Sequence, residues 1–407
     1  MSLGLSATTA LIAWLSVAPP IEAPPPKPET ASKTSLQVER DPGQGVRLST
    51  ADGRFSMQTW MRAQFRDSFV HDPNASPSLH HTLEARRASV YLAGHVFGPH
   101  NKVFMQLAFA PRDLGLQTGH VTQSPIADLF VTFDYLRDLS IRIGQYKPFF
   151  SRQFIASWGN LQFVDRSIVQ NEFHLDRDIG FDLFSNDLGG LDLLRYSVGV
   201  YSGQGRNNLT RRDFRMTYLA RFEVLPFGGF NEYSEADLER RPTPKLALGA
   251  AYAYSDHARA ERGVIGAKPA DGGTTNFHHV VADAIFKIRG FSAQAEFFWR
   301  QGTRNPGSAV DAIGVAIPVS AARNGLGWFA QAGYLLPRAP VEFVVRGGQI
   351  FGLGETSLTD ANEVGGGPNW YFRNHTMKLQ ADYFHTWIGS DIQHGSDQFR
   401  LQLQVSL

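Results

Sequence analysis

The sequence contains no cysteine, few charged residues and, after residue 21, no long apolar run. The lack of cysteine excludes a disulfide scaffold, a thiolate zinc site, an iron–sulfur cluster and a cysteine nucleophile. The lack of any run of about 18 apolar residues excludes a bundle of membrane-spanning helices. Charged residues make up 19% of the chain, below the roughly 25% of an average soluble domain. The net charge of only +1 argues against a nucleic-acid-binding protein with a basic surface.

Aromatic residues and glycine are, by contrast, abundant. Aromatic residues make up 12% of the chain, with 30 phenylalanines, and glycine occupies 39 of the 407 positions. A cysteine-free chain that is rich in both and only moderately polar has the composition expected of a β-barrel in an outer membrane.

The N-terminal segment has the pattern of an exported protein. Residues 11–18 form a short apolar core that suits a signal peptide better than a spanning helix, and two prolines follow it. We therefore expect residues 1–23 to be a signal peptide whose cleavage position is open, with a disordered tail as the alternative. Residues 24–45 are rich in proline and charge and predict an extended periplasmic linker. The remaining residues, 46–407, are expected to form the barrel.

Apolar and polar residues alternate with a period of two throughout residues 46–407. In the last segment, Phe399, Leu401 and Leu403 fall on one face, whereas Gln402 and Gln404 fall on the other. Repeated segments of this kind, separated by turn residues, predict an all-β transmembrane antiparallel barrel of about 16 strands. The predicted strands are 54–70, 83–97, 102–110, 126–135, 139–148, 178–184, 195–201, 214–224, 245–254, 279–288, 291–300, 326–335, 341–349, 364–372, 377–385 and 398–407.

The connections between these strands alternate between long and short. Long connections follow the odd-numbered strands and short ones follow the even-numbered strands, with 227–244 as an exception. Outer-membrane barrels have long outer loops and short periplasmic turns, so the alternation favours a barrel over a soluble β-sandwich.

The third long connection, 149–175, carries more apolar side chains than a solvated loop needs. Phe154, Trp158 and Phe163 belong to it, together with Arg152. We expect this loop to fold inward against the barrel wall and to narrow the pore. Packing on neighbouring outer loops or on another subunit is the alternative.

Arginines supply the candidate anion-binding residues. By strand parity, basic side chains modestly outnumber acidic ones on the lumen face, which is typical of pores that favour anions. The candidates near the constriction are Arg62, Arg66, Arg86, Arg87 and Arg142. Arg87 has lumen parity, whereas Arg86 needs a kink or a position at the rim to join it. The alternative is that wall carboxylates pair with these arginines and merely keep the lumen wet.

The sequence gives little support for an enzyme active site or a metal site. His80–His81 and His278–His279 are adjacent pairs, so their side chains point to opposite faces of a strand and suit a shared metal poorly. No nucleophile elbow, phosphate-binding loop or zinc-protease motif is present. We therefore expect no catalytic residues, no metal and no cofactor.

Five segments follow one another along the chain: ADGRFSMQTWMRAQF, EARRASVYLAGHVFG, IRIGQYKPFFSRQF, LQFVDRS and GPNWYFRNHTMKLQADYFH. In their order and spacing they resemble the phosphate-selective porin family, the O and P type porins of Gram-negative outer membranes. The resemblance implies a trimeric barrel of sixteen strands whose third outer loop folds inward. It also implies that arginines near the constriction bind anions, and Arg62 and the pair Arg86–Arg87 match by motif.

The sequence thus predicts an outer-membrane porin for passive diffusion of small anions, with phosphate and polyphosphate as candidates. Its expected partners are outer-membrane lipid, two further copies of the chain and small anions such as phosphate, and no nucleic acid. The alternatives are a general diffusion porin with little ion preference, and an outer-membrane enzyme or structural barrel.

Overall fold

The computed structural model describes residues 35–41, 43–115, 123–207 and 214–407. The expected signal peptide and most of the expected linker lie outside the described residues. No helix among the described residues is long and apolar enough to cross a bilayer.

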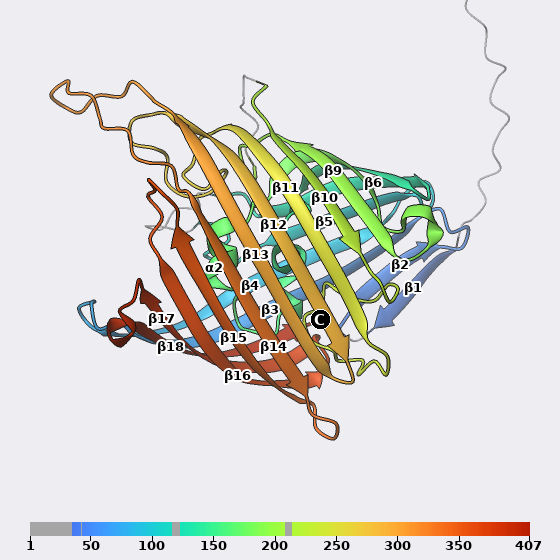
Figure 1. The fold of residues 1–407 in the computed structure, drawn as a ribbon. Helices are drawn as coiled ribbons and strands as arrows, with labels where there is room; N and C mark the ends of the chain where they lie inside the picture. Colours follow the sequence, from blue (N-terminus) through green and yellow to red (C-terminus); the bar gives the residue numbers. More distant parts are fainter. Residues whose placement is uncertain (1–34, 42, 116–122, 208–213) are drawn as a thin grey trace, which may run out of the picture. The chain divides into compact units, whose positions relative to one another are not determined.

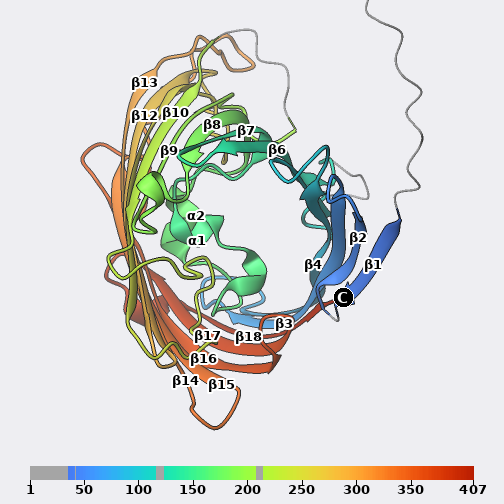
Figure 2. The ribbon, with the colours of Figure 1, turned by 90° about the vertical axis from the view of Figure 1, so that its right-hand side faces the viewer.

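Sixteen strands, β3 to β18, form a closed antiparallel ring (Figures 1 and 2). Each pairs with its neighbours in the chain, and β18 pairs with β3 to close the ring, with Gln404 opposite Gln64. Closing the ring pairs the backbone N–H and C=O groups at the strand edges, and lipid hydrocarbon could not hydrogen-bond these groups. The strands are β3 (Ser56–His71), β4 (Leu79–His95), β5 (Asn101–Ala108), β6 (Ile126–Leu136), β7 (Leu139–Tyr146), β8 (Asp178–Ser185), β9 (Leu194–Tyr201), β10 (Thr217–Val224), β11 (Lys245–Ala258), β12 (Thr274–Ile288), β13 (Phe291–Asn305), β14 (Gly325–Leu335), β15 (Val341–Gly352), β16 (Ala361–Arg373), β17 (Met377–Ile388) and β18 (Ser396–Ser406).

The two faces of each strand differ as the period of two predicts. On β18, Phe399 is 45% exposed and Leu401 39%, whereas Gln402 and Gln404 are buried. The amide of Gln64 donates to Gln404 Oε1 over 2.8 Å inside the barrel. The predicted barrel and its strand faces are confirmed.

A hairpin precedes the barrel. It consists of β1 (Leu36–Asp41) and β2 (Gly45–Thr50), and β2 pairs with the first residues of β3. Strand structure therefore begins at Leu36, inside the segment 24–45 that the sequence predicted to be a linker.

The β7–β8 connection, residues 147–177, is named L3 here; its short helices lie within the ring of strands in Figure 2. These helices are α1 (Arg152–Ile155), η1 (Trp158–Asn160) and α2 (Ile168–Phe173). A serine begins each one: the hydroxyls of Ser151, Ser157 and Ser167 accept from the backbone N–H groups of Phe154, Gly159 and Gln170. Serine caps of this kind explain why the loop forms three compact turns.

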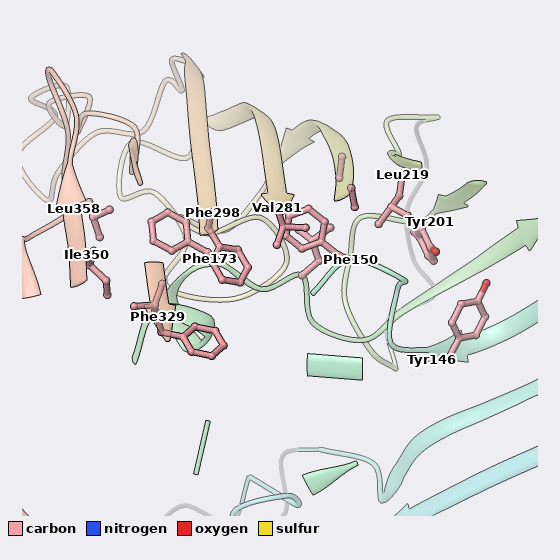
Figure 3. Packing of buried hydrophobic residues seen from close by; sticks show 14 residues of the cluster. Tyr146, Phe150, Phe173, Tyr201, Leu219, Val281, Phe298, Phe329, Ile350 and Leu358 are labelled. Atoms are coloured by element: carbon pink, nitrogen blue, oxygen red, sulfur yellow. The ribbon is translucent and has the colours of Figure 1, made fainter. Parts of the chain in front are cut away.

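Apolar residues join L3 to one wall of the barrel. Phe150, Val169 and Phe173 are buried against lumen-facing side chains of β10 to β15 (Figure 3). Phe173 stacks on Phe298 with ring centroids 5.8 Å apart. The apolar surplus that the sequence shows in this loop is thus buried inside the barrel.

The β10–β11 connection, residues 225–244 and named T4 here, reaches the same loop from the opposite rim. Glu235 Oε1 accepts from Gln153 Nε2 at 3.0 Å, and its Oε2 accepts from Gln162 N at 2.7 Å. The backbone N–H of Glu235 donates to Asn160 O at 3.1 Å. T4 is the connection whose length broke the predicted alternation, and its contacts hold L3.

Candidate functional site

Four arginines surround one carboxylate where L3 approaches β3, β4 and β18. We name Arg66, Arg86, Arg87 and Arg400 the arginine cluster; its centre is Asp165 of L3. Asp165 Oδ2 lies 2.6 Å from Arg66 Nη1 and 3.3 Å from Arg400 Nη1. Its Oδ1 lies 3.3 Å from Arg87 Nη2 and 3.7 Å from Arg86 Nη2. The structure therefore brings together three of the five arginines predicted to bind anions.

A β-bulge in β4 turns both arginines of the predicted pair into the lumen. Gln64 is opposite Arg87 in the register, whereas Phe65 is opposite Ala85, so β4 holds one extra residue at this point. A bulge of this kind shifts the strand's alternation by one position. The side chains of Arg86 and Arg87 are only 7% and 14% exposed. The kink that the sequence required for Arg86 is this bulge.

Positive charge exceeds negative charge in the cluster. Besides Asp165, the carboxylate of Asp382 lies 2.7 Å from Arg400, and that of Glu84 lies 3.6 Å from Arg86. Four guanidinium groups thus meet three carboxylates. Burial alone would raise the pKa of the Asp165 carboxyl, but the four surrounding arginines hold that pKa well below its ordinary value.

Arg62 lies beside the cluster and has no acidic partner among the described residues. Its Nε donates to Ser406 Oγ at 2.9 Å, and its Nη1 donates to Ser157 Oγ at 3.0 Å. The guanidinium groups of Arg62 and Arg87 each lie 5.4 Å from the ring centre of Trp158. Trp158 therefore holds two cations by its π-face, and Arg62 keeps an unneutralised charge.

A cavity of about 560 Å³ opens next to Arg62. Its lining joins L3, T4 and the first barrel strands, and includes Arg62, Gln58, Asn160, Asp237, Glu239, Arg241 and Lys287. Among the charged residues, three cations meet two carboxylates. The cations of the cavity thus outnumber its carboxylates by one.

Two further cations on L3 bind only backbone carbonyls. Lys147 Nζ donates to Phe154 O at 2.8 Å. Arg166 Nε donates to Gln153 O at 2.9 Å, and its Nη2 donates to Ala156 O at 2.8 Å. Within the described part of the chain, neither forms an ion pair with a carboxylate.

Arg142, predicted to bind anions near the constriction, lies away from the cluster, and so does Arg152, which belongs to L3 as predicted. Arg142 Nη2 is 2.5 Å from Asp182 Oδ2, and the guanidinium carbon of Arg142 lies 3.8 Å from the ring centre of Tyr146. Arg152 is fully buried, with Nε 2.6 Å from Asp283 and Nη2 3.0 Å from Glu223. Both arginines are neutralised and act as structural ties.

The three aromatic residues predicted for the loop also have different surroundings. Trp158 faces the arginines, whereas Phe154 packs against His174, with ring centres 4.4 Å apart. Phe163 packs edge-on against Phe384 at 5.2 Å and lies 4.6 Å from the Arg346 guanidinium. Phe163 therefore anchors the loop to β17, whereas Phe154 packs within L3, with Lys147 Nζ 5.1 Å and the Arg166 guanidinium 5.2 Å from its ring centre. Trp158 contacts Arg62 and Arg87 instead.

Sequence reasoning missed five members of the site: Arg400, Asp165, Lys147, Arg166 and Glu235. Arg400 had lumen parity, so its strand position was the available signal. The other four lie in connections, where no periodicity shows which way a side chain points.

A profile of the family described as phosphate-selective porin O and P matches residues 68–387 of the chain. No curated protein sequence matches this chain. Among solved structures, OmpT of Vibrio cholerae lacking loop L8 is 8% identical, with a TM-score of 0.56 over 86% of this chain and 99% of that one.

Two further structures are similar in the same way. The outer membrane channel DcaP of Acinetobacter baumannii is 12% identical, with a TM-score of 0.55 over 88% of this chain and 99% of that one. The trimer form of in-vitro folded OmpT of Vibrio cholerae is 8% identical, with a TM-score of 0.52 over 86% of this chain and 99% of that one. At these identities the similarity shows the barrel fold alone.

Proposed function

Because the chain belongs to the phosphate-selective porin O and P family, we propose that this outer-membrane barrel is a passive channel that favours small anions, with phosphate among them. The observation that carries the proposal is the charge balance beside L3. The arginine cluster has four guanidinium groups against three carboxylates, and Arg62, Lys147 and Arg166 have no acidic partner in the described part of the chain.

In this proposal, ions pass through the cavity next to Arg62, between L3, T4 and the first barrel strands. On its other side, L3 is sealed to the wall by buried apolar side chains and neutralised ion pairs. An anion that crosses the pore would therefore meet Arg62, Arg87 and Trp158. Guanidinium groups remain charged at any physiological pH and donate paired hydrogen bonds to phosphate oxygens.

A general diffusion porin is the second candidate, because the carboxylates within the cluster offset most of its charge. It would show little preference between chloride and potassium.

Reversal potentials across a planar bilayer under a salt gradient distinguish the two. Arg62→Gln removes a charge from the path, so it should move the reversal potential toward cation preference. Arg137→Gln removes the same charge from an exposed turn, where the side chain is 64% exposed, and should leave the potential unchanged. Equal potentials for wild type and Arg62→Gln would favour the general porin.

We also propose a homotrimer, in line with the trimer form of OmpT. Chemical cross-linking of the detergent-extracted protein should yield a three-chain band. A band that stops at one chain would contradict this assembly.

A further inference from the structure

We propose that Asp165 determines how tightly the pore holds oxyanions, because its carboxylate occupies the place between the arginines that a permeating oxyanion would take. The inference rests on the proposed function and adds a specificity-determining residue to it. In this view, L3 carries its own anion into the arginine cluster and prevents tight binding of anions from solution.

The geometry around Asp165 is that of a bound oxyanion. Its two oxygens are divided between two pairs of guanidinium groups, one with Arg66 and Arg400 and the other with Arg86 and Arg87. Carboxylate and phosphate oxygens accept charge-assisted hydrogen bonds from guanidinium in the same manner. A cluster that receives one can therefore receive the other.

Asp165 differs from the other carboxylates of the cluster in where it comes from. Asp382 and Glu84 lie on barrel strands, whereas Asp165 lies on L3 and faces the path. Its side chain is 21% exposed, between the 2% of Asp382 and the 35% of Glu84. Unlike those two, Asp165 contacts all four arginines of the cluster, so it is the carboxylate with which an incoming anion competes.

The loop around Asp165 does not depend on its carboxylate. Val164 N donates to Asp382 Oδ2 at 3.1 Å, and Arg66 Nη2 donates to Val164 O at 3.1 Å. Arg346 Nη1 donates to the backbone oxygen of Asp165 at 3.0 Å. A neutral side chain at position 165 would therefore leave the backbone in place.

Asp165→Asn tests the inference, since it removes the charge and keeps the size. Four guanidinium groups would then face only two carboxylates, and an uncompensated charge of this kind is unfavourable unless an anion joins it. Inorganic phosphate added to a chloride solution should block the single-channel current at a concentration about tenfold lower than in wild type.

Glu172→Gln is the matched control. Glu172 is an acidic residue of the same loop, but it pairs with Arg300 at 2.5 Å and with Arg323 at 2.7 Å, outside the cluster. The control should leave the phosphate block as in wild type. An equal gain in both variants would overturn the inference, because a general change of charge would then explain it.

Two other results would also overturn it. One is a phosphate block in Asp165→Asn equal to that of wild type. The other is a larger conductance with weaker anion preference, which would mean that the loop had moved. Wild-type selectivity separates this inference from the proposed function: an anion-selective wild type with an unchanged Asp165→Asn contradicts the inference alone.

Discussion

The two sides of L3 carry arginines in different surroundings. On the side packed against β10 to β15, Arg152 is fully buried and shares two carboxylates, Asp283 and Glu223, with its neighbour Arg221. On the side that faces β3, β4 and β18, four arginines share three carboxylates, and Arg62 has none among the described residues. Arg152 and its neighbour are thus matched by carboxylates on the packed side, whereas positive charge is in excess on the other side, which is where the proposed function places the attraction of anions.

The largest effect on stability is expected on the packed side. Arg152→Ala removes one cation from Asp283 and one from Glu223, and breaking a buried pair costs about 3–5 kcal/mol. The free energy of unfolding of the detergent-folded barrel in urea measures it. Arg137→Ala, at an exposed turn, is the control and should unfold like wild type. Equal stability of the two variants would show that Arg152 does not hold the loop.

A smaller loss is expected where T4 supports L3. Glu235→Ala removes the acceptor for Gln153 Nε2 and Gln162 N, which should cost about 1.5–3 kcal/mol and increase current fluctuations in the open channel. Glu355→Ala is the control, because this exposed residue of the β15–β16 connection lies outside L3, T4 and the cavity. Identical current traces from both variants would refute a role for T4 in holding the loop.

The smallest effect is expected at Trp158, on the side that faces the path. Trp158→Leu keeps an apolar contact but removes the π-face shared by Arg62 and Arg87, a loss of about 0.5–2 kcal/mol. Urea unfolding should detect it, and the ordering relative to Arg152→Ala is the informative result. A loss as large as that of Arg152→Ala would remove the distinction between the two sides.

Much of the barrel could be predicted from the sequence because membrane strands impose a period of two. The strand faces of β18 and the inward position of Arg87 follow from parity. The inward position of Arg86 depends on a bulge. Parity places Arg86 and Arg87 on opposite faces, so it can show only that both face inward if the strand is irregular. L3 has more apolar side chains than a solvated loop needs, which indicated that it packs against the barrel wall.

The centre of the site could not be predicted in the same way. Asp165 and Glu235 lie in connections, where side-chain direction depends on contacts between segments distant in the chain. Glu235 meets Gln153 across 82 positions, and Asp165 meets Arg400 across 235. Arg142 and Arg152 have the charge expected of an anion-binding residue, but each pairs with a carboxylate of another element, Asp182 of β8 and Asp283 of β12. A sequence pattern contains no signal for such pairings.

The sign of the wild-type reversal potential in a potassium chloride gradient tests the central claim most directly. The excess of arginine over carboxylate beside β3, β4 and β18 predicts that chloride crosses more readily than potassium. The potential should therefore lie on the chloride side of zero. A potential at zero or on the potassium side would contradict the account, because the unpaired arginines would then not control which ions pass.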